Sequence, residues 1–334
     1  MRQRVLWMLL LFLGVGVVGG FAQEESITTT SYKFLDVPPS PQSLANGGII
    51  LTYIDANPLL AFDNPALFGQ ETAGQLGLSY FNYMRGINAL NAIYGSAIGD
   101  RGTWAVGVRA LKYDEMQGYD TQGLATNKFT AMDAALEGLF SYDLTDNLRG
   151  GLALKAVYGV IEKYSAFALV SDAGLSYYDG KSGTSIGLTL TNVGGTLKSY
   201  GEQRSLPPWD IRVGYSQALS HAPFRVHVTL YGLSPYHIRT MGKGETSLKK
   251  VMRHFSLGAE FTPNEQFWVG VGYSPNTALS LSKQGARSLS GFSCGVGFNT
   301  DYLRLALSAA VYHPQVLGLM FSVSTNFGND RFIF

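Results

Sequence analysis

Cysteine is almost absent from this sequence, which contains only Cys294. One cysteine excludes a disulfide framework and a thiolate metal cage. Cys294 stands in an alternating apolar pattern between Phe292 and Phe298, where we expect a small packing residue. The five histidines are scattered, and neither a His-Glu-x-x-His motif nor a P-loop occurs. The sequence therefore predicts no catalytic residue, no metal site, no cofactor and no enzymatic activity.

Charge is also scarce. Charged residues make up 15% of the chain, whereas a soluble globular protein has roughly 25%. The formal net charge of +1 lacks the basic surplus that nucleic-acid binding requires, so no nucleic-acid partner is expected. The 19 tyrosines and 19 phenylalanines exclude a disordered chain.

Long apolar runs are missing everywhere except at the N-terminus. Arg2 and Arg4 precede an uninterrupted apolar stretch over 5–18, and Gly20 and Ala22 follow as small residues. This order is typical of a secretory signal peptide, so we expect residues 1–22 to be removed after Ala22. An anchor helix is the alternative, but the stretch is short for a membrane span. The mean hydropathy of +0.07 excludes a multi-span helical protein.

What the chain has in abundance is glycine, with 40 residues, and alternation of period two. One face of each alternating segment is apolar, and the other is rich in Gly, Ser, Thr and Ala with occasional charges. A soluble β-sandwich shows similar alternation but usually carries more charge outside. A membrane barrel places lipid on the apolar face and a polar lumen on the other.

The lengths of the connections distinguish these two folds. We count fourteen strand-like segments, beginning near residues 73, 87, 103, 129, 147, 164, 183, 208, 222, 252, 266, 289, 301 and 315. The connections after even-numbered strands are all short, and the long ones, 114–127, 194–207, 234–250 and 275–287, follow odd-numbered strands. Outer-membrane barrels sort their loops in this way, with short periplasmic turns and longer loops at the cell surface. The prediction is an all-β transmembrane antiparallel barrel over 73–334, in the bacterial outer membrane.

Aromatic residues gather near the predicted strand ends, as in the two aromatic girdles of a membrane barrel. They are Tyr80, Tyr83, Tyr113, Phe140, Tyr142, Tyr177, Tyr178, Trp209, Tyr273, Tyr302 and Tyr312. A terminal aromatic, Phe334, follows the last alternating strand and supports the same assignment.

Residues 23–72 do not alternate, and they contain Pro and Asn-Pro signals that break strands. Their apolar residues favour packing over a flexible tail. We expect this segment to fill the lumen as a plug or hatch, reached from the periplasm.

The stretch Leu59-Leu-Ala-Phe-Asp-Asn-Pro-Ala-Leu67, with its motif Asn64, Pro65 and Ala66, resembles the FadL-type outer-membrane family. Together with Leu76-Gly-Leu-Ser-Tyr-Phe-Asn-Tyr83, the strand over 164–169 and His221-Ala-Pro-Phe-Arg225, it is most similar to the PorQ-like branch of type IX secretion. That resemblance implies a non-catalytic component of an attachment complex that holds a PorZ-like surface protein. PorU- and PorV-like subunits are the further partners it implies, and the complex processes cargo and joins it to lipopolysaccharide. A FadL-like channel for hydrophobic small molecules is the alternative function.

The connection over 234–250 is the basic spot of the chain, with Arg239, Lys243, Lys249 and Lys250 against Glu245. Long loops often carry function. We expect these four cations to contact a partner protein or lipopolysaccharide phosphates, with plain solvation as the alternative. Inside the lumen, Asp133 and Glu137 stand four residues apart on one strand face, with Arg149 and Lys155 as their expected partners.

Overall fold

The computed structural model describes residues 31–53, 56–201, 205–281, 289–300, 302–313 and 315–327. The predicted signal peptide, residues 23–30 of the expected plug and the terminal aromatic all lie outside the described residues. Among the described residues, no helix has both the length and the apolarity needed to cross a membrane.

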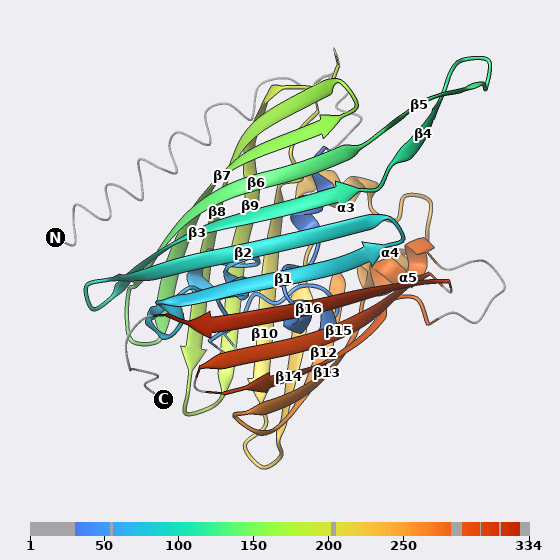
Figure 1. The fold of residues 1–334 in the computed structure, drawn as a ribbon. Helices are drawn as coiled ribbons and strands as arrows, with labels where there is room; N and C mark the ends of the chain where they lie inside the picture. The colour runs from blue at the N-terminus through green and yellow to red at the C-terminus, as the bar shows by residue number, and fades with distance from the viewer. Residues whose placement is uncertain are drawn as a thin grey trace.

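Fourteen antiparallel strands close into one barrel, in which β1 pairs with β16 (Figure 1). The barrel strands are β1 (Gln75–Met84), β2 (Ile87–Ile98), β3 (Gly102–Tyr113), β6 (Ala131–Asp143), β7 (Leu148–Ile161), β8 (Tyr164–Asp179), β9 (Thr184–Lys198), β10 (Asp210–Ala218), β11 (Phe224–Leu230), β12 (Phe255–Asn264), β13 (Phe267–Tyr273), β14 (Phe292–Asn299), β15 (Leu303–His313) and β16 (Val316–Asn326). The predicted fourteen-stranded barrel is confirmed, and every predicted strand start lies within three residues of the observed one.

Loop length sorts by barrel end, as the sequence predicted. One end, here called the short-turn end, has connections of at most five residues. The other, the long-loop end, carries every longer connection. Three of these contain secondary structure that the sequence did not predict. A hairpin of β4 (Met116–Tyr119) and β5 (Ala125–Phe129) projects beyond β3 and β6 (Figure 1), and three short helices follow β11 and β13, namely α3 (Pro235–Thr240), α4 (Ser247–Arg253) and α5 (Pro275–Leu281).

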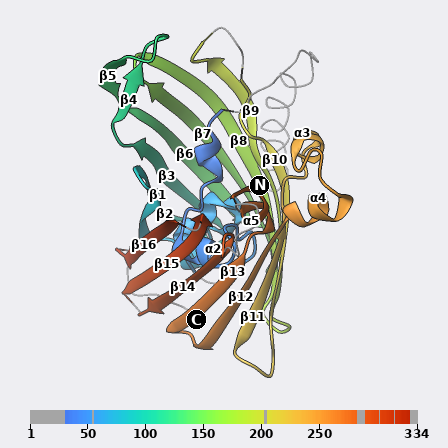
Figure 2. The same cartoon turned by 90° about the vertical axis from the view of Figure 1, so that its right-hand side faces the viewer.

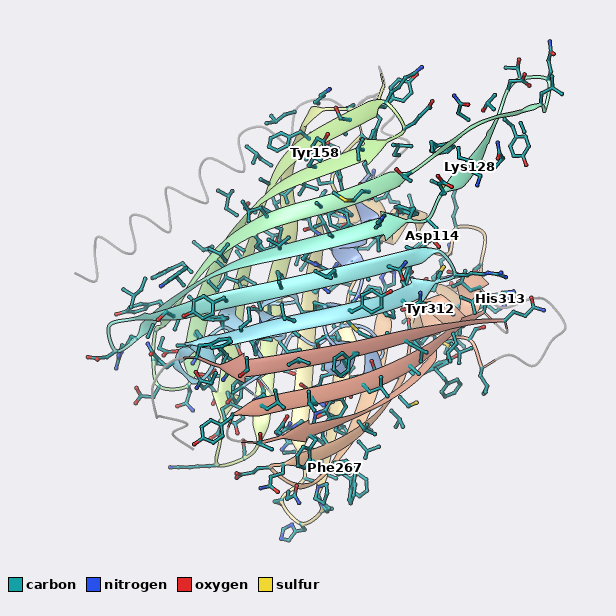
Figure 3. The ribbon with its side chains drawn as sticks, viewed as in Figure 1. Asp114, Lys128, Tyr158, Phe267, Tyr312 and His313 are labelled. Atoms are coloured by element: carbon teal, nitrogen blue, oxygen red, sulfur yellow. The ribbon has the colours of Figure 1, made fainter. Side chains whose placement is uncertain are left out.

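The strands alternate between an exposed apolar face and a buried inward face. On β7, Lys155 and Val157 are buried, whereas Leu154 and Tyr158 are exposed. Tyr158 and Phe267 lie on the outward side of the ribbons (Figure 3). Cys294, expected as a small packing residue of the apolar pattern, lies on the outward face of β14 and is exposed. A period of two places successive side chains on opposite faces, which is why the apolar set ends up on the outside of the closed sheet.

Residues 31–53 and 56–72, here called the lumen segment, lie within the ring of strands (Figure 2). The segment is built from short turns rather than strands: η1 (Lys33–Asp36), α2 (Pro41–Ala45), η2 (Pro58–Phe62), η3 (Pro65–Leu67) and η4 (Gln70–Thr72). Proline begins α2, η2 and η3, where its missing N–H costs nothing. Ser40 and Asn57 cap α2 and η2 by accepting backbone N–H bonds.

The apolar core of the molecule lies between the lumen segment and the wall. Leu59, Phe62 and Phe68 of the segment pack with Ile93, Ala105, Leu139 and Ala153 of four strands. Small wall residues make room for this contact. A Cβ on Gly187 of β9 would lie 2.0 Å from the Leu51 carbonyl oxygen. The glycine-rich inward face therefore follows the shape of the segment that it holds.

Candidate functional site

A cavity of about 350 Å³ opens at the long-loop end, here called the long-loop cavity. It lies between the lumen segment, the first turn of α5 and the residues around α3. Its lining combines apolar and charged side chains. The apolar side chains include Val37, Leu44, Met241 and Phe292. The charged ones include Asp36, Asp210 and Arg212, and His237 is also part of the lining.

Aromatic rings form one wall of this cavity. Tyr83 and Tyr312 meet edge to face with 4.8 Å between their ring centroids, and Phe81 lies 5.4 Å from Tyr83. Tyr312 is buried, so Tyr83 and Tyr312 line the cavity and do not contribute to an outer aromatic girdle, contrary to the sequence analysis. Tyr178 likewise packs against Tyr53 of the lumen segment, at 4.9 Å. These strand-end aromatics bind the segment and shape an apolar surface.

Arg212 joins the lumen segment to the wall on the opposite side. Its Nη2 donates to Asp36 at 2.5 Å, and its Nε donates to Asp210 at 3.2 Å. The Asp210 carboxylate also accepts the backbone N–H groups of Gly232 at 2.7 Å and Ser234 at 3.2 Å. These bonds lie where the β10–β11 ladder has ended, since its last pair is Val213 with Leu230. A carboxylate thus replaces ladder bonds at this point of the wall.

The Asn64-Pro-Ala motif fastens the lumen segment to β7 and β8. The Asn64 Oδ1 accepts the Ala66 N–H at 3.0 Å, while its Nδ2 donates to the carbonyls of Leu51 at 2.8 Å and Leu175 at 3.2 Å. A Cβ on Gly174 of β8 would lie 2.0 Å from Asn64 Oδ1. Asn64 therefore caps η3, and its amide group also links η3 to Leu51 of the segment and to Leu175 of β8.

Two further polar contacts hold the segment nearer the short-turn end. Arg149 of β7 donates to both carboxylate oxygens of Glu71, at 2.7 and 3.1 Å, and to Asp143 at 2.5 Å. Glu260 of β12 accepts from Asn46 at 2.7 Å and from Gln42 at 3.2 Å. Charged groups of the wall thus hold the segment near its start, after α2 and at its end.

Of the lumen charges expected to pair, only some do so. Lys155 lies 2.6 Å from Asp172 and 4.0 Å from Glu137, so its predicted contact with Glu137 is the longer of two. Arg149 contacts neither Asp133 nor Glu137, because it lies opposite Asp143 at the short-turn end and donates to Asp143 and to Glu71 of the lumen segment. Asp133 instead accepts from Tyr200 at 3.1 Å. The sequence did not identify Asp172 and Glu71 as partners, because contacts with another strand or with the lumen segment cannot be read from the alternation within one strand.

The four cations singled out in the 234–250 connection lie on or between α3 and α4. Arg239, Lys243 and Lys249 are exposed, and Lys250 is half-buried. The neighbouring Arg253 is buried instead and donates to Glu245 at 2.5 and 2.8 Å. Hydrogen bonding from Arg253 lowers the pKa of the Glu245 carboxyl below its usual value. Glu245, the acid that offsets the cations in the sequence, is therefore already committed to Arg253.

Two short segments of the chain match the Gly-x-Ser-x-Gly pattern, but neither has the geometry of a nucleophile elbow. Ser185 lies within β9 and donates to the Tyr177 carbonyl at 3.0 Å. Ser293 lies within β14 and donates to the Ala45 carbonyl at 3.2 Å. A nucleophile elbow requires a turn from strand to helix, which neither serine occupies. Within the described ranges, no group of three His, Cys, Asp or Glu side chains could hold a metal ion.

No family model and no curated protein matches this chain. Solved structures do resemble it. The toluene transporter TodX of Pseudomonas putida aligns over 87% of this chain and 98% of its own, with a TM-score of 0.58 and 14% identity. The monoaromatic hydrocarbon channel CymD aligns over 89% and 99%, with a TM-score of 0.54 and 14% identity. At this identity the similarity confirms the FadL-like barrel fold and nothing finer.

Proposed function

We propose that this protein is an outer-membrane channel that takes up a small, largely apolar molecule through the long-loop cavity. The observation that carries the proposal is the cavity itself, placed between an aromatic wall and the lumen segment. Ligand pockets are concave and mostly apolar, with a few polar groups that fix orientation. Arg212 and Asp36 supply such groups here, and they also hold the segment. A ligand that competes for them would loosen the segment, which would then act as a hatch.

The location in the outer membrane rests on the outward face of the barrel. Leucine, valine and aromatic side chains are exposed on most strands, among them Leu136, Leu188 and Phe321. A soluble monomer rarely exposes a contiguous apolar surface of such extent. Lipid on the outside explains it, and a closed sheet suits a bilayer because its backbone groups pair between neighbouring strands. The names of TodX and CymD describe transport of monoaromatic molecules by barrels of this fold.

Photolabelling tests the channel proposal directly. A diazirine derivative of toluene would be photolysed with the protein in lipid nanodiscs, and the labelled peptides would be identified by mass spectrometry. We expect label on the peptides around Met241 and Tyr312, which line the cavity. Ala310→Phe on β15 fills the cavity and should reduce that label at least tenfold. Ala309→Phe, one residue away on the outward face, is the matched control. Equal labelling of both variants would refute the proposal.

A scaffold within a type IX secretion attachment complex is the second candidate. It is favoured by the densely packed lumen segment and by the hairpin of β4 and β5, which projects away from the barrel (Figure 3). Tyr119 and Leu124 of this hairpin are exposed. An affinity isolation from outer membranes, with and without residues 116–129, separates the candidates. A scaffold should retain PorZ-, PorU- or PorV-like proteins only when the hairpin is present. Isolation of the intact barrel without such partners counts against this role.

A further inference from the structure

The connection over residues 231–254, here called the α3–α4 loop, is held rigidly at the long-loop end. Arg253 at the end of α4 donates to Asn276 Oδ1 at 2.9 Å and to Ser280 at 2.7 Å, both on α5, as well as to Glu245. Ser234 caps α3, and His237 Nδ1 lies 2.8 Å from the Ser234 hydroxyl. Because both helices are tied down, the side chains they expose have a defined direction.

Those exposed side chains are apolar on one face of α4. Leu248, Val251 and Met252 stand at i, i+3 and i+4, a spacing that gathers them on one side of a helix. Leu248 is 71% exposed, and Ile238 on α3 is 56% exposed. An apolar side chain gains free energy when it is removed from water, so this face requires a cover.

The position of the loop indicates what covers it. In Figure 2, α3 and α4 lie outside the ring of strands, beside β10 and β11, rather than over the barrel interior. The outward face of the next strands continues the same apolar surface, with Leu257 on β12 and the Tyr273–Phe292 ring pair at 4.7 Å. The exposed apolar side chains of α4 thus stand on the same outer side of the ring as the lipid-facing surface of the barrel.

Cations lie beside this apolar face, and the carboxylate near them is Glu245, whose pKa Lys249 and Lys250 help Arg253 to lower. Among the ion pairs of the described residues, none involves Arg239, Lys243, Lys249 or Lys250. Lys249 and Lys250 follow Leu248 directly on α4. Long cationic side chains can keep their apolar stems in the hydrocarbon boundary and extend the charged group toward headgroups. Cations next to an apolar helix face are the composition of an interfacial membrane helix.

We propose that α4 lies in the interfacial layer of the outer leaflet, with Leu248, Val251 and Met252 among acyl chains and Lys249 and Lys250 on phosphate groups of anionic lipid. This anchor holds one border of the long-loop cavity, where His237 and Met241 stand, at the membrane surface. The inference rests on the membrane location within the proposed function, but not on the identity of any ligand.

Depth-dependent fluorescence quenching tests the anchor. A Cys294→Ser background removes the single cysteine. The dye NBD would then be attached to L248C on α4, to L136C on the outward face of β6, or to L124C at the tip of the projecting hairpin. In nanodiscs that contain lipid with a nitroxide near the headgroup, we expect L248C to be quenched at least twofold more than L124C. A second nanodisc preparation, with the nitroxide deep on the acyl chain, is used for L136C, which lies in the middle of β6 and reports whether the barrel itself is in the bilayer.

Charge reversal tests the phosphate contact. Immobilisation of spin-labelled phosphatidic acid by the wild-type barrel should fall at least twofold in the K249E/K250E double variant. Lys128→Glu on the hairpin, an exposed position away from the helices (Figure 3), should leave it unchanged. Zwitterionic phosphatidylcholine should respond to neither variant.

The outcomes separate this proposal from the proposed function. Quenching of L136C without quenching of L248C overturns the anchor and leaves the channel intact. Absence of quenching at both positions refutes the membrane location on which both rest. A dye at L248C that is shielded only when outer-membrane proteins are added would assign the surface to a protein partner and overturn the lipid contact.

Discussion

At the scale of single residues, glycine determines how closely the lumen segment approaches the wall. Gly151 on β7 faces the Pro65–Ala66 peptide, and a Cβ there would lie 2.4 Å from the Ala66 nitrogen. That neighbour is backbone and belongs to a turn already fixed by Asn64. The atoms around Gly151 therefore cannot move aside as a flexible side chain would.

We expect Gly151→Ala to displace the segment from β7. Overpacking of this kind costs about 1–3 kcal/mol. Amide hydrogen exchange over residues 64–68 should accelerate accordingly in the intact barrel. Gly138→Ala on β6 is the matched control, because a Cβ there meets no atom within 4 Å. Equal exchange in the two variants would show that the segment does not pack as described.

Asp63 is a buried carboxyl of the lumen segment, and its pKa is raised above its usual value. Burial raises its pKa from 3.8 to about 6, although the Ser43 hydroxyl, which donates at 2.6 Å, lowers it in part. The packed segment therefore binds the proton more tightly than the released segment does. Between pH 4 and 6, rising pH removes the proton from the released state first, so packing loses stability over this range.

The loss should be complete above pH 6 and should reach about 3 kcal/mol, since each pKa unit corresponds to about 1.4 kcal/mol. Asp63→Asn keeps an acceptor for Ser43 and removes the charge, so it should abolish this dependence and favour packing at pH 8. The opening free energy of the segment, from amide exchange corrected for intrinsic rates at pH 4.5 and pH 8, provides the measurement. A wild-type segment that becomes more stable with rising pH would contradict the assignment.

At the scale of elements, period-two alternation was sufficient to predict every barrel strand, because each strand faces lipid on one side and the lumen on the other. The predicted start near 164 coincides with the first residue of β8. The same rule could not find α4, since a seven-residue helix leaves little periodic signal and depends on Arg253 and α5. Nor could it find the cavity, which requires Tyr83 and Tyr312 to meet across 228 intervening positions of the chain.

The partners of the lumen segment were beyond sequence reasoning for a related reason. Asn64-Pro-Ala was recognised as a motif, and its helical-turn cap follows from local chemistry. Its bond to Leu175 depends on which strand lies opposite, and that is a property of the closed barrel. Local capping is thus predictable from the sequence, whereas docking of one element on another is not.

The ion pair of Glu71 with Arg149 fastens the end of the lumen segment next to β1. Both carboxylate oxygens of Glu71 accept from Arg149, and the side chains of Glu71 and Arg149 are 22% and 18% exposed. Glu71→Gln removes the negative charge from this contact. We expect a loss of about 1–3 kcal/mol in segment docking, because the substitution leaves the partly buried Arg149 with Asp143 as its charged partner. Limited proteolysis near residue 71 reports the loss. Glu115→Gln at the exposed pair with Lys128 should change nothing, and a similar effect there would indicate a general loss of stability.

At the scale of the whole molecule, the two faces of the barrel wall are suited to different surroundings. Its outward face carries apolar side chains, whereas its inward face combines hydrogen bonds and ion pairs to the lumen segment with apolar contacts to Leu59, Phe62 and Phe68. A water-soluble protein would place these two surfaces the other way round. The cost of an outward charge should therefore depend on its distance from the barrel ends, as bilayer depth requires.

Leu136 and Ile98 test this depth dependence on the same outward face. Leu136 lies in the middle of β6, opposite Val108, and Ile98 ends β2 at the short-turn end. In lipid vesicles, Leu136→Arg should lower the free energy of unfolding by about 2–4 kcal/mol, and Ile98→Arg by about 0–1 kcal/mol. Denaturant titrations of refolding into vesicles measure both values. Equal costs at the two positions would mean that water, and not hydrocarbon, contacts the middle of the barrel, because only a bilayer distinguishes a residue by its distance from the rim.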